Sequence, residues 1–417
     1  MGDVDPRSPG REGSDGRSRD GVRRGGARPG IGWARCAGRP WRAELSAVTV
    51  FALILGFVLL MAGGESLVRG ASSLARTLGM SPLVVGLTVV SFTTSAPELA
   101  VGVGAVFDGH PGLAVGNVVG SNIANILLVL GAAALAAPLA VNSQAVRTDI
   151  PVMIVLSAGM FLLALDGTVS RFDGGVLFAA LLVYVTVTVV VSRRRAFAGT
   201  APLPVPEDVG QGPERARGPL ALRALADLGL VVLGAALLVA GARLLVGAAS
   251  QIAAQLGVSD LVIGLTVVAV GTSLPELVTC VVAVVKGQRD LALGNVVGSN
   301  VFNIGAVLGL SAVVAPEGVE VATSALRFDL PIMFAVTLIL LPIALTRLAV
   351  ARWEGAVLLV FYCAYIGYLL LEAGGYGALD LYGAVMLWFA VSVTVVWFVL
   401  LAMSELGLRR GRWGRRP

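Results

Sequence analysis

Two parts of the chain are near copies of two later parts, and this duplication restricts the possible folds more than any other feature. Residues 81–100, SPLVVGLTVVSFTTSAPELA, align without gaps to 259–278, SDLVIGLTVVAVGTSLPELV, with 13 of 20 positions identical. The same offset of 178 positions (259 − 81) aligns LAVGNVVGSNIANILLVLG at 113–131 with LALGNVVGSNVFNIGAVLG at 291–309, where 14 of 19 positions are identical. Two copies of one pattern predict that the two halves of the chain fold into the same unit.

The copies lie among apolar segments that are long enough to cross a membrane. The chain is 56% hydrophobic and 14% charged, whereas soluble domains carry about 25% charged residues. Its apolar residues fall in blocks of about 18 or more, and a helix of that length crosses a bilayer core of about 30 Å. We therefore predict an all-α polytopic membrane protein with eleven spans, near 46–68, 81–105, 112–138, 149–166, 173–192, 220–247, 259–285, 290–315, 327–346, 353–373 and 379–403.

The order of these spans predicts two inverted-topology five-helix repeats. Five spans lie in residues 46–192 and five in residues 220–373, with a polar linker at 193–219 between them. An odd number of spans per repeat threads the second copy through the membrane in the opposite direction, which is typical of secondary transporters with a binding site at the midplane. The last span, 379–403, is an extra C-terminal transmembrane helix outside this plan.

The distribution of basic residues predicts the orientation in a plasma (inner) membrane. Basic residues concentrate in cytoplasmic loops, and a cytoplasmic linker at 193–219 also places Lys286 and the basic tail 404–417 in the cytoplasm. The Arg- and Gly-rich stretch 1–45, which we expect to be disordered, would then lie outside, in conflict with its ten arginines. Either that tail crosses the membrane regardless of charge, or the true start lies near Val48.

The first copied segment breaks its own helix and supplies oxygen atoms at the break. Pro97 has no N–H, so the carbonyl of Thr93 loses its helical partner, and Pro275 does the same to Gly271. Free backbone at membrane depth must be buried in protein or line a wet cavity. In each copy one helical turn places two hydroxyls beside a carboxylate, namely Thr94, Ser95 and Glu98, and Thr272, Ser273 and Glu276.

The second copied segment adds further oxygen donors. In both copies of GNVVGSN a serine and an asparagine lie four positions apart, namely Ser121 and Asn125, and Ser299 and Asn303. Hard cations such as Ca²⁺ and Na⁺ take oxygen ligands, and Ca²⁺ takes about six to eight of them. Because the repeat is inverted, we predict that the two sets face each other and form one cation site.

Glu98 and Glu276 are the carboxylates that we expect near the middle of a span, and an ionisable group at that depth is a functional candidate. The sequence leaves open the alternative that each is a neutral carboxyl that only joins neighbouring helices. We interpret the remaining membrane-proximal charges as structural: interfacial pairs with nearby arginines for Asp149 and Asp329, and helix-end charges for Glu65, Arg69 and Arg243.

The GTSxPE-like and GNVVGSN motifs together make the chain resemble the sodium/calcium exchanger family, within the wider cation/Ca²⁺ antiporters, over about 46–373. The resemblance implies ten helices in two inverted five-helix repeats, with one ion site formed by the second and third helices of both repeats. It also implies that the ten residues of the two motifs are the ligands, together with backbone carbonyls near Ser91 and Ala269. Some exchangers carry aspartate where Asn303 stands, so this site has two formal charges rather than three.

The function implied by the resemblance is that of a secondary active antiporter, not an enzyme, which exchanges Ca²⁺ for Na⁺ by alternating access. It implies no cofactor, and as partners only the lipid bilayer and the transported cations, without nucleic acid. The linker is too short for the Ca²⁺-sensing domains of animal members. A proton-coupled cation antiporter is the nearest alternative and a passive cation channel a remote one; the oligomeric state is left open.

Overall fold

The structure is a computed structural model that describes residues 47–197, 220–256, 269–345 and 348–373. Four predicted parts lie outside these ranges, in whole or in most of their length: 1–45, 193–219, 379–403 and 404–417.

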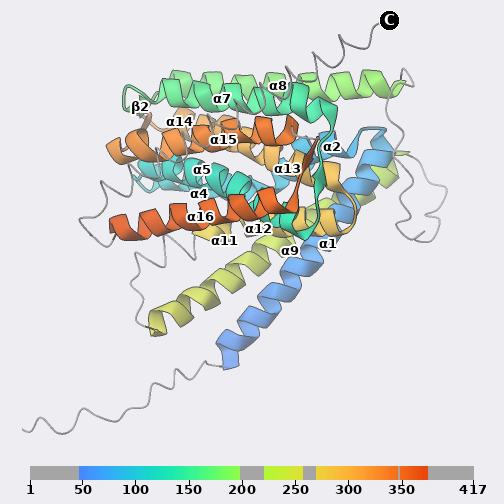
Figure 1. Cartoon of the computed structure of the whole chain (residues 1–417), viewed down its shortest axis with the longest axis horizontal. Coiled ribbons are helices and arrows are strands. Elements are labelled where there is room, and N and C mark those ends of the chain that lie inside the picture. The colour runs from blue at the N-terminus through green and yellow to red at the C-terminus, as the bar shows by residue number, and fades with distance from the viewer. Residues whose placement is uncertain (1–46, 198–219, 257–268, 346–347, 374–417) are drawn as a thin grey trace, which may run out of the picture. The chain divides into compact units, whose positions relative to one another are not determined.

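The described residues form two sets of helices in the same order (Figure 1). In the first set, with η for a π-helix, these are α1 (Ala47–Leu78), α2 (Pro82–Val85), η1 (Gly86–Val90), α3 (Ser91–Thr94), α4 (Ala96–Phe107), α5 (Gly112–Ala124), η2 (Asn125–Leu130), α6 (Gly131–Ala136), η3 (Ala145–Asp149), α7 (Ile150–Leu163) and α8 (Arg171–Phe197). In the second set they are α9 (Leu220–Gln255), α11 (Ala269–Thr272), α12 (Leu274–Val285), α13 (Arg289–Phe302), η5 (Asn303–Leu308), α14 (Gly309–Val314), η6 (Ala325–Asp329), α15 (Leu330–Leu345) and α16 (Arg352–Ala373).

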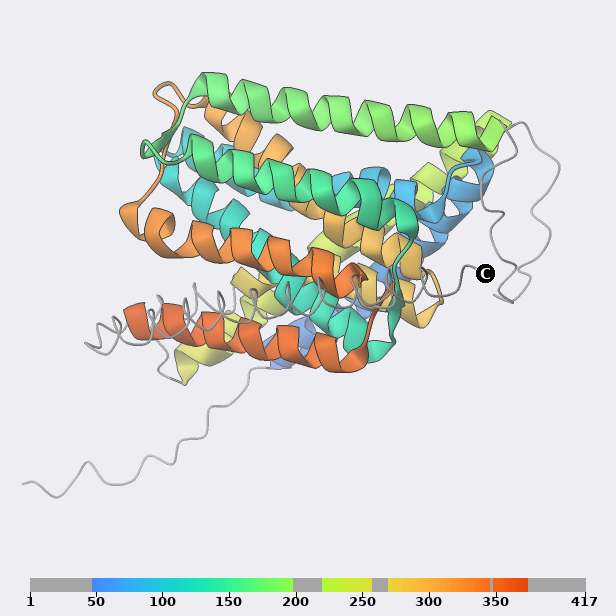
Figure 2. The same ribbon diagram turned by 45° about the horizontal axis from the view of Figure 1, so that its top comes forward.

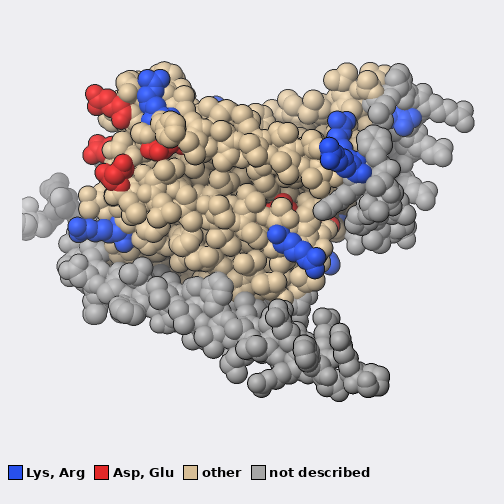
Figure 3. Space-filling model, turned by 90° about the horizontal axis from the view of Figure 1, so that it is seen from above, with Lys and Arg blue, Asp and Glu red and all other residues tan. Residues whose placement is uncertain are grey.

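These helices cross a membrane. Within the described ranges, eight helical stretches are long and apolar enough to do so, and the bent pair Pro82–Thr94 and Ala96–Phe107 makes a ninth. Figure 3 shows a broad band that is almost free of charged side chains, with acidic side chains gathered at one end of it and basic ones at both ends. The protein is a multi-pass membrane protein, as its hydropathy predicted.

Irregular turns recur at matching positions in the two sets, which supports the predicted repeat. The π-helices η2 and η5 begin at Asn125 and Asn303, which occupy equivalent positions in the two copies, 178 residues apart. Residues related by this offset are called mates below. The π-helices η3 and η6 begin at Ala145 and Ala325, and both precede a proline in the following helix. A π-turn is rare in a helix, so two of them at equivalent places are evidence for one shared fold.

Two short strand pairs show that the repeats are inverted. Strand β1 (Leu139–Ala140) pairs antiparallel with β4 (Ala349–Val350), and β2 (Thr168–Val169) pairs antiparallel with β3 (Val319–Glu320). Each pair takes one strand from each repeat, and β1 and β2 stand at opposite ends of α7. The strand that follows the third span of one repeat therefore meets the strand that follows the fourth span of the other, as an inverted repeat requires.

The outer helices repeat this exchange between the sets. The fifth helix of the first repeat, α8, packs on α14 and η5 of the second, and α16 packs on α6 and η2 of the first. Figures 1 and 2 show α8 and α16 on opposite sides of the inner helices. Each repeat thus covers the inner helices of the other, so neither buries its apolar surface alone.

The first helices of the two repeats, α1 and α9, pack on each other. Both run at an oblique angle to the other helices (Figure 1). Their contacts are symmetric: a Cβ on Gly56 would lie 2.9 Å from the carbonyl oxygen of Gly241, and one on Gly63 would lie 2.8 Å from that of Gly234. Gly56 and Gly63 are the mates of Gly234 and Gly241. Small residues allow two membrane helices to approach this closely.

One structural assignment made from the sequence is wrong. Helix α1 has 32 residues and α9 has 36, about 48 Å and longer at 1.5 Å per residue, so Glu65 and Arg243 lie within helices rather than at their ends. Hydropathy marks only the part of a helix inside the bilayer core. Asp149, which was predicted to pair with a nearby arginine at the interface, is fully buried, and it accepts a hydrogen bond from the hydroxyl of Tyr184 at 3.1 Å.

Candidate functional site

The second span of each repeat breaks at the same serine. Helix α4 starts after Ser95, whose φ and ψ are −84° and 0°, and α12 starts after Ser273, with −88° and 4°. The first-repeat span bends by 43° there, so the predicted interruption is confirmed. Proline is the second residue of the helix that begins after each break. The N–H groups of the first turn have no partner within their own helix, so the proline costs the new helix no hydrogen bond.

The break places a carboxylate at the start of a helix inside the membrane. Glu98 lies in the first turn of α4 and Glu276 in the first turn of α12. The free N–H groups and the dipole of a helix favour negative charge at its N-terminus. The two breaks thus give each glutamate partial compensation that a continuous helix would not.

Close packing between the repeats brings the two motifs together. Helix α13 of the second repeat crosses α2, η1 and α3 of the first. A Cβ on Gly294 would lie 2.5 Å from the carbonyl oxygen of Leu83, and one on Gly298 would lie 2.2 Å from Oγ of Ser91. Glycine is therefore required at both positions, because any side chain would push α13 away from the broken span.

The two glutamates are the buried groups of the candidate site that most need a polar partner. Glu98 and Glu276 are each 1% exposed. Among the described residues, Oε2 of Glu98 and both carboxylate oxygens of Glu276 have no hydrogen-bond partner. A buried polar group without a partner costs about 1–3 kcal/mol, and a charged group more. A cation between the two carboxylates would supply the missing interaction.

The hydroxyl of Thr94 connects the broken span to α13. It donates a hydrogen bond to Oδ1 of Asn295 at 3.2 Å and lies 3.4 Å from Oγ of Ser299. Thr94 and Ser299 belong to different repeats, so the structure brings together two of the predicted ligands that the sequence separates by 205 positions. Thr94 is 1% exposed and Ser299 is fully buried.

The third spans contribute asparagines at the start of their π-helices. Asn125 and Asn303 are the first residues of η2 and η5, where the wider turn displaces side chains from the regular helical positions. Both side-chain polar atoms of Asn125 lack a hydrogen-bond partner within the described part of the chain, as does Oδ1 of Asn303. The hydroxyls of Ser95 and Ser273 are likewise buried without a partner there.

Nine of the ten predicted ligands are buried, and the tenth, Thr272, is half-buried. The residues that precede Thr272, 257–268, lie outside the described ranges. The carbonyl of Ser91, one of two expected backbone ligands, accepts a hydrogen bond from the N–H of Ser95 at 2.9 Å. The hydroxyl of Thr94 also lies within hydrogen-bonding distance of this oxygen, at 3.4 Å, so both of its lone pairs have a possible donor and a cation bound there would replace the Thr94 contact.

The other asparagines of the GNVVGSN motif also make contacts at the site, although they were not among the predicted ligands. Asn117 donates to the carbonyl oxygen of Glu98 at 3.2 Å, and its mate Asn295 donates to Sγ of Cys280 at 3.3 Å. Asn122 accepts from Asn303. The signal was available, because all these asparagines are identical in the two copies of the motif.

Together these groups can bind cations that prefer oxygen. The site has two carboxylates, hydroxyls, amide oxygens and water-excluded surroundings. Two formal negative charges match one divalent cation or two monovalent ones. Hydroxyl and amide oxygens can complete the shell of a hard cation without adding charge.

Known proteins resemble the chain over its membrane part. The model of the family described as "Sodium/calcium exchanger protein" matches residues 48–190 and 227–371. The CaxA protein of Alkalimonas amylolytica is 42% identical over 324 residues, which cover 77% of this chain and 97% of that protein. The sodium/calcium exchanger MaX1 of Methanosarcina acetivorans is 36% identical over 347 residues, with 76% and 97% covered.

Solved structures resemble the fold as well. A structure of the sodium-calcium exchanger NCX_Mj superimposes with a TM-score of 0.64 at 30% sequence identity, covering 77% of this chain and 98% of that one. The similarity extends over nearly the whole of each relative, so it includes both repeats rather than one motif.

Proposed function

The chain belongs to the sodium/calcium exchanger family, which makes it a cation/Ca²⁺ antiporter and not an enzyme, and we propose that it exchanges Ca²⁺ for Na⁺ by alternating access at the site between its two repeats. The observation that carries this proposal is the pair Glu98 and Glu276, buried together with carboxylate oxygens that lack partners in the described part of the chain. Such a pair is stable only with a bound cation or protons.

The proposed ligands are the oxygen atoms of the two duplicated motifs. They come from Thr94, Ser95, Glu98, Ser121, Asn125, Thr272, Ser273, Glu276, Ser299 and Asn303. Burial of nine of them supports this set, as does the contact between Thr94 and Ser299 of different repeats. Asn117, Asn295 and Asn122 would hold the set in place through their hydrogen bonds.

The negative charge of the empty site would couple the movement of Ca²⁺ to that of Na⁺. Two uncompensated carboxylates in a low-dielectric core cost several kcal/mol each, so a site emptied of cations would not pass through a closed, dry state. One Ca²⁺ or two Na⁺ would neutralise both glutamates and allow the site to change sides. Ca²⁺ movement in one direction would therefore require Na⁺ movement in the other.

The orientation belongs to the same proposal. In the plasma (inner) membrane, with the linker and the C-terminus in the cytoplasm, the turn at Lys286 faces the cytoplasm and the turn at Asp108 faces outward. The excess of basic residues in cytoplasmic loops supports this assignment.

Uptake of radiolabelled Ca²⁺ into proteoliposomes tests the exchange. One set of vesicles is given an outward Na⁺ gradient, a second an outward H⁺ gradient and a third neither, with protein-free vesicles as control. We expect uptake in the Na⁺ set alone. Uptake driven only by H⁺ would favour proton-coupled exchange, and uptake without a counter-ion gradient would favour a channel.

A further inference from the structure

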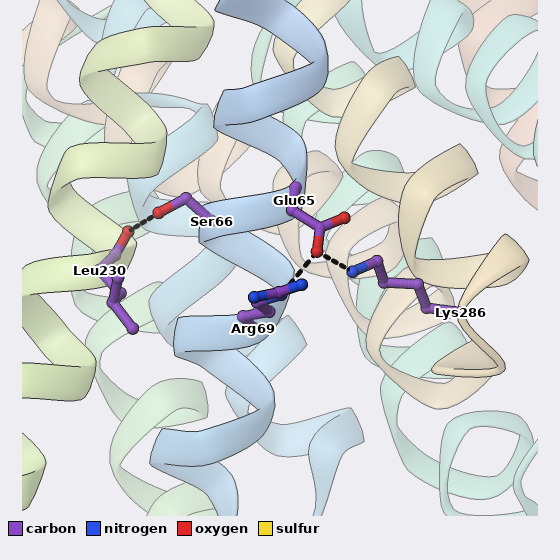
Figure 4. A network of polar contacts seen from close by, with 5 residues as sticks. All are labelled: Glu65, Ser66, Arg69, Leu230 and Lys286. Carbon is purple, nitrogen blue, oxygen red and sulfur yellow. Dashed lines mark hydrogen bonds and ion pairs between the residues drawn. The ribbon is translucent and has the colours of Figure 1, made fainter. Parts of the chain in front are cut away.

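Glu65 of α1 forms an ion pair with Lys286, which follows the last residue of α12 (Figure 4). Glu65 also pairs with Arg69 one turn along α1. The Glu65–Lys286 pair joins the crossed helices α1 and α9, on one side, to the broken span that carries Glu276, on the other. Its side chains are 37% and 26% exposed, as expected near the end of a membrane span.

The residues at the equivalent positions of the other repeat are a corresponding pair with the charges exchanged. At the offset of 178 positions, Glu65 corresponds to Arg243 of α9, and Lys286 corresponds to Asp108, which follows the last residue of α4. The acid of one pair is thus a base in the other, and the base an acid. Because the repeats are inverted, the two pairs belong to opposite ends of the membrane part.

The mate pair is not formed in this structure. Within the described ranges, Arg243 and Asp108 are both exposed and neither has an ion-pair partner. Asp108 lies at the C-terminal end of α4, where the helix dipole disfavours negative charge. A basic partner there would stabilise it.

The helix contacts differ between the two repeats in the same way as the ion pairs. Helix α1 lies against α12: a Cβ on Gly64 would be 2.9 Å from Cγ1 of Val278, and Thr279 is 1% exposed. On the mate helix α4, Val101, the mate of Thr279, is 48% exposed. A Cβ on Gly104 would meet nothing within 4 Å in the described part of the chain.

Side-chain sizes at the two contacts are nevertheless complementary. Where α12 presents Val278 and Val282, α1 presents Gly64; where α4 presents Ala100 and Gly104, α9 presents Ala242. In each case a small side chain allows the helices to approach. This contact is open on the α4 side, whereas Ala242 of α9 is 7% exposed; its side-chain sizes are as suitable for close packing as those of the formed contact.

We propose that Glu65–Lys286 and Arg243–Asp108 are two alternating latches. The first holds α1 on α12 and closes one end of the transporter; the second forms when α9 packs on α4 and closes the other end. This inference rests on the proposed alternating access. The structure corresponds to the state in which the Lys286 end is closed.

A reporter disulfide tests the second latch without replacing its charges. Gly104→Cys and Ala242→Cys are combined with Cys36→Ser and Cys363→Ser, while buried Cys280 is kept. Close approach of α9 to α4 would bring the two new sulfurs within bonding geometry. The rate of disulfide formation on mild oxidation is measured by mass spectrometry on purified protein in liposomes.

The latch variants should act in opposite directions. Since a partly exposed ion pair contributes little, we expect Glu65→Gln to accelerate disulfide formation about two- to fivefold and Arg243→Gln to slow it by a similar factor. Arg69→Gln is the matched control, because it removes a charge beside Glu65 that does not bridge two helices. The exchanged pair Glu65→Lys with Lys286→Glu should restore the original rate.

Three results would overturn the latches: no disulfide under any ion condition, equal rates in all variants, or the same direction of change for Glu65→Gln and Arg243→Gln. The readout needs no transport, and Ca²⁺ uptake is measured in parallel on the same preparations. Opposite rate changes without Na⁺-driven uptake would keep the latches and reject the proposed exchange.

Discussion

Asn303 donates a hydrogen bond from Nδ2 to Oδ1 of Asn122, 3.1 Å away, and thereby ties the third spans of the two repeats together. Both residues are buried, and Oδ1 of Asn303 has no partner among the described residues. One asparagine thus joins the repeats through its nitrogen and leaves its oxygen available for a cation. Aspartate in its place would add a charge but lose the hydrogen bond.

We expect Asn303→Asp to change the coupling and the stability together. A third carboxylate needs one more positive charge for neutrality, so Na⁺ activation of Ca²⁺ uptake should become steeper. Loss of the bond to Asn122 should lower the melting temperature of the purified protein. Asn125→Asp is the comparison, because Asn125 has no such bond within the described ranges. Equal loss of stability in both variants would contradict the structural role of the Asn303–Asn122 bond.

Glu98→Gln and Glu276→Gln should each abolish Na⁺-driven Ca²⁺ uptake while the protein remains folded. Removing one of two charges leaves a bound Ca²⁺ uncompensated, and we expect at least about a 100-fold loss, equivalent to about 2.7 kcal/mol. Uptake into proteoliposomes is measured beside the melting temperature. Glu320→Gln, which alters an exposed carboxyl on β3, serves as control. Full activity of the double variant Glu98→Gln/Glu276→Gln would reject the proposed site.

Adjacent glycines in α8 provide a test of the packing between repeats. A Cβ on Gly174 would lie 2.6 Å from the carbonyl oxygen of Gly309, whereas one on Gly175 would meet nothing within 4 Å in the described structure. We expect Gly174→Ala to lower the melting temperature by several degrees. Gly175→Ala should leave it unchanged or raise it, since alanine is favoured over glycine in a helix by about 1 kcal/mol. The reverse order would show that α8 does not pack on α14 as described.

The tyrosine–aspartate pairs of the two repeats should differ in their contribution to stability. Tyr184 donates to fully buried Asp149, and Tyr365 donates to partly buried Asp329 at 3.0 Å. Removing a donor from a buried carboxyl costs about 1–3 kcal/mol. Thermal unfolding should therefore show a larger loss for Tyr184→Phe than for Tyr365→Phe. Equal losses would mean that burial of the aspartate does not set the cost.

The sequence alone was sufficient for the class of fold and for the two helix breaks beside the proposed site. Spans, their number per repeat and the inversion follow from hydropathy and from one duplicated pattern. Within the described ranges, the structure has the predicted breaks at Ser95 and Ser273. The breaks were predictable because the missing N–H of proline acts within one turn, a distance that the sequence itself specifies.

The packing of the helices determines which groups meet across the repeats and where the symmetry fails. The contact of Thr94 with Asn295 joins residues 201 positions apart, and it depends on how closely α13 crosses the broken span. The sequence favours neither of the pairs Glu65–Lys286 and Arg243–Asp108 over the other, yet in the described structure only the first is formed. A duplicated sequence specifies both arrangements equally, whereas a single packed state of α1 and α9 can satisfy only one of them at a time.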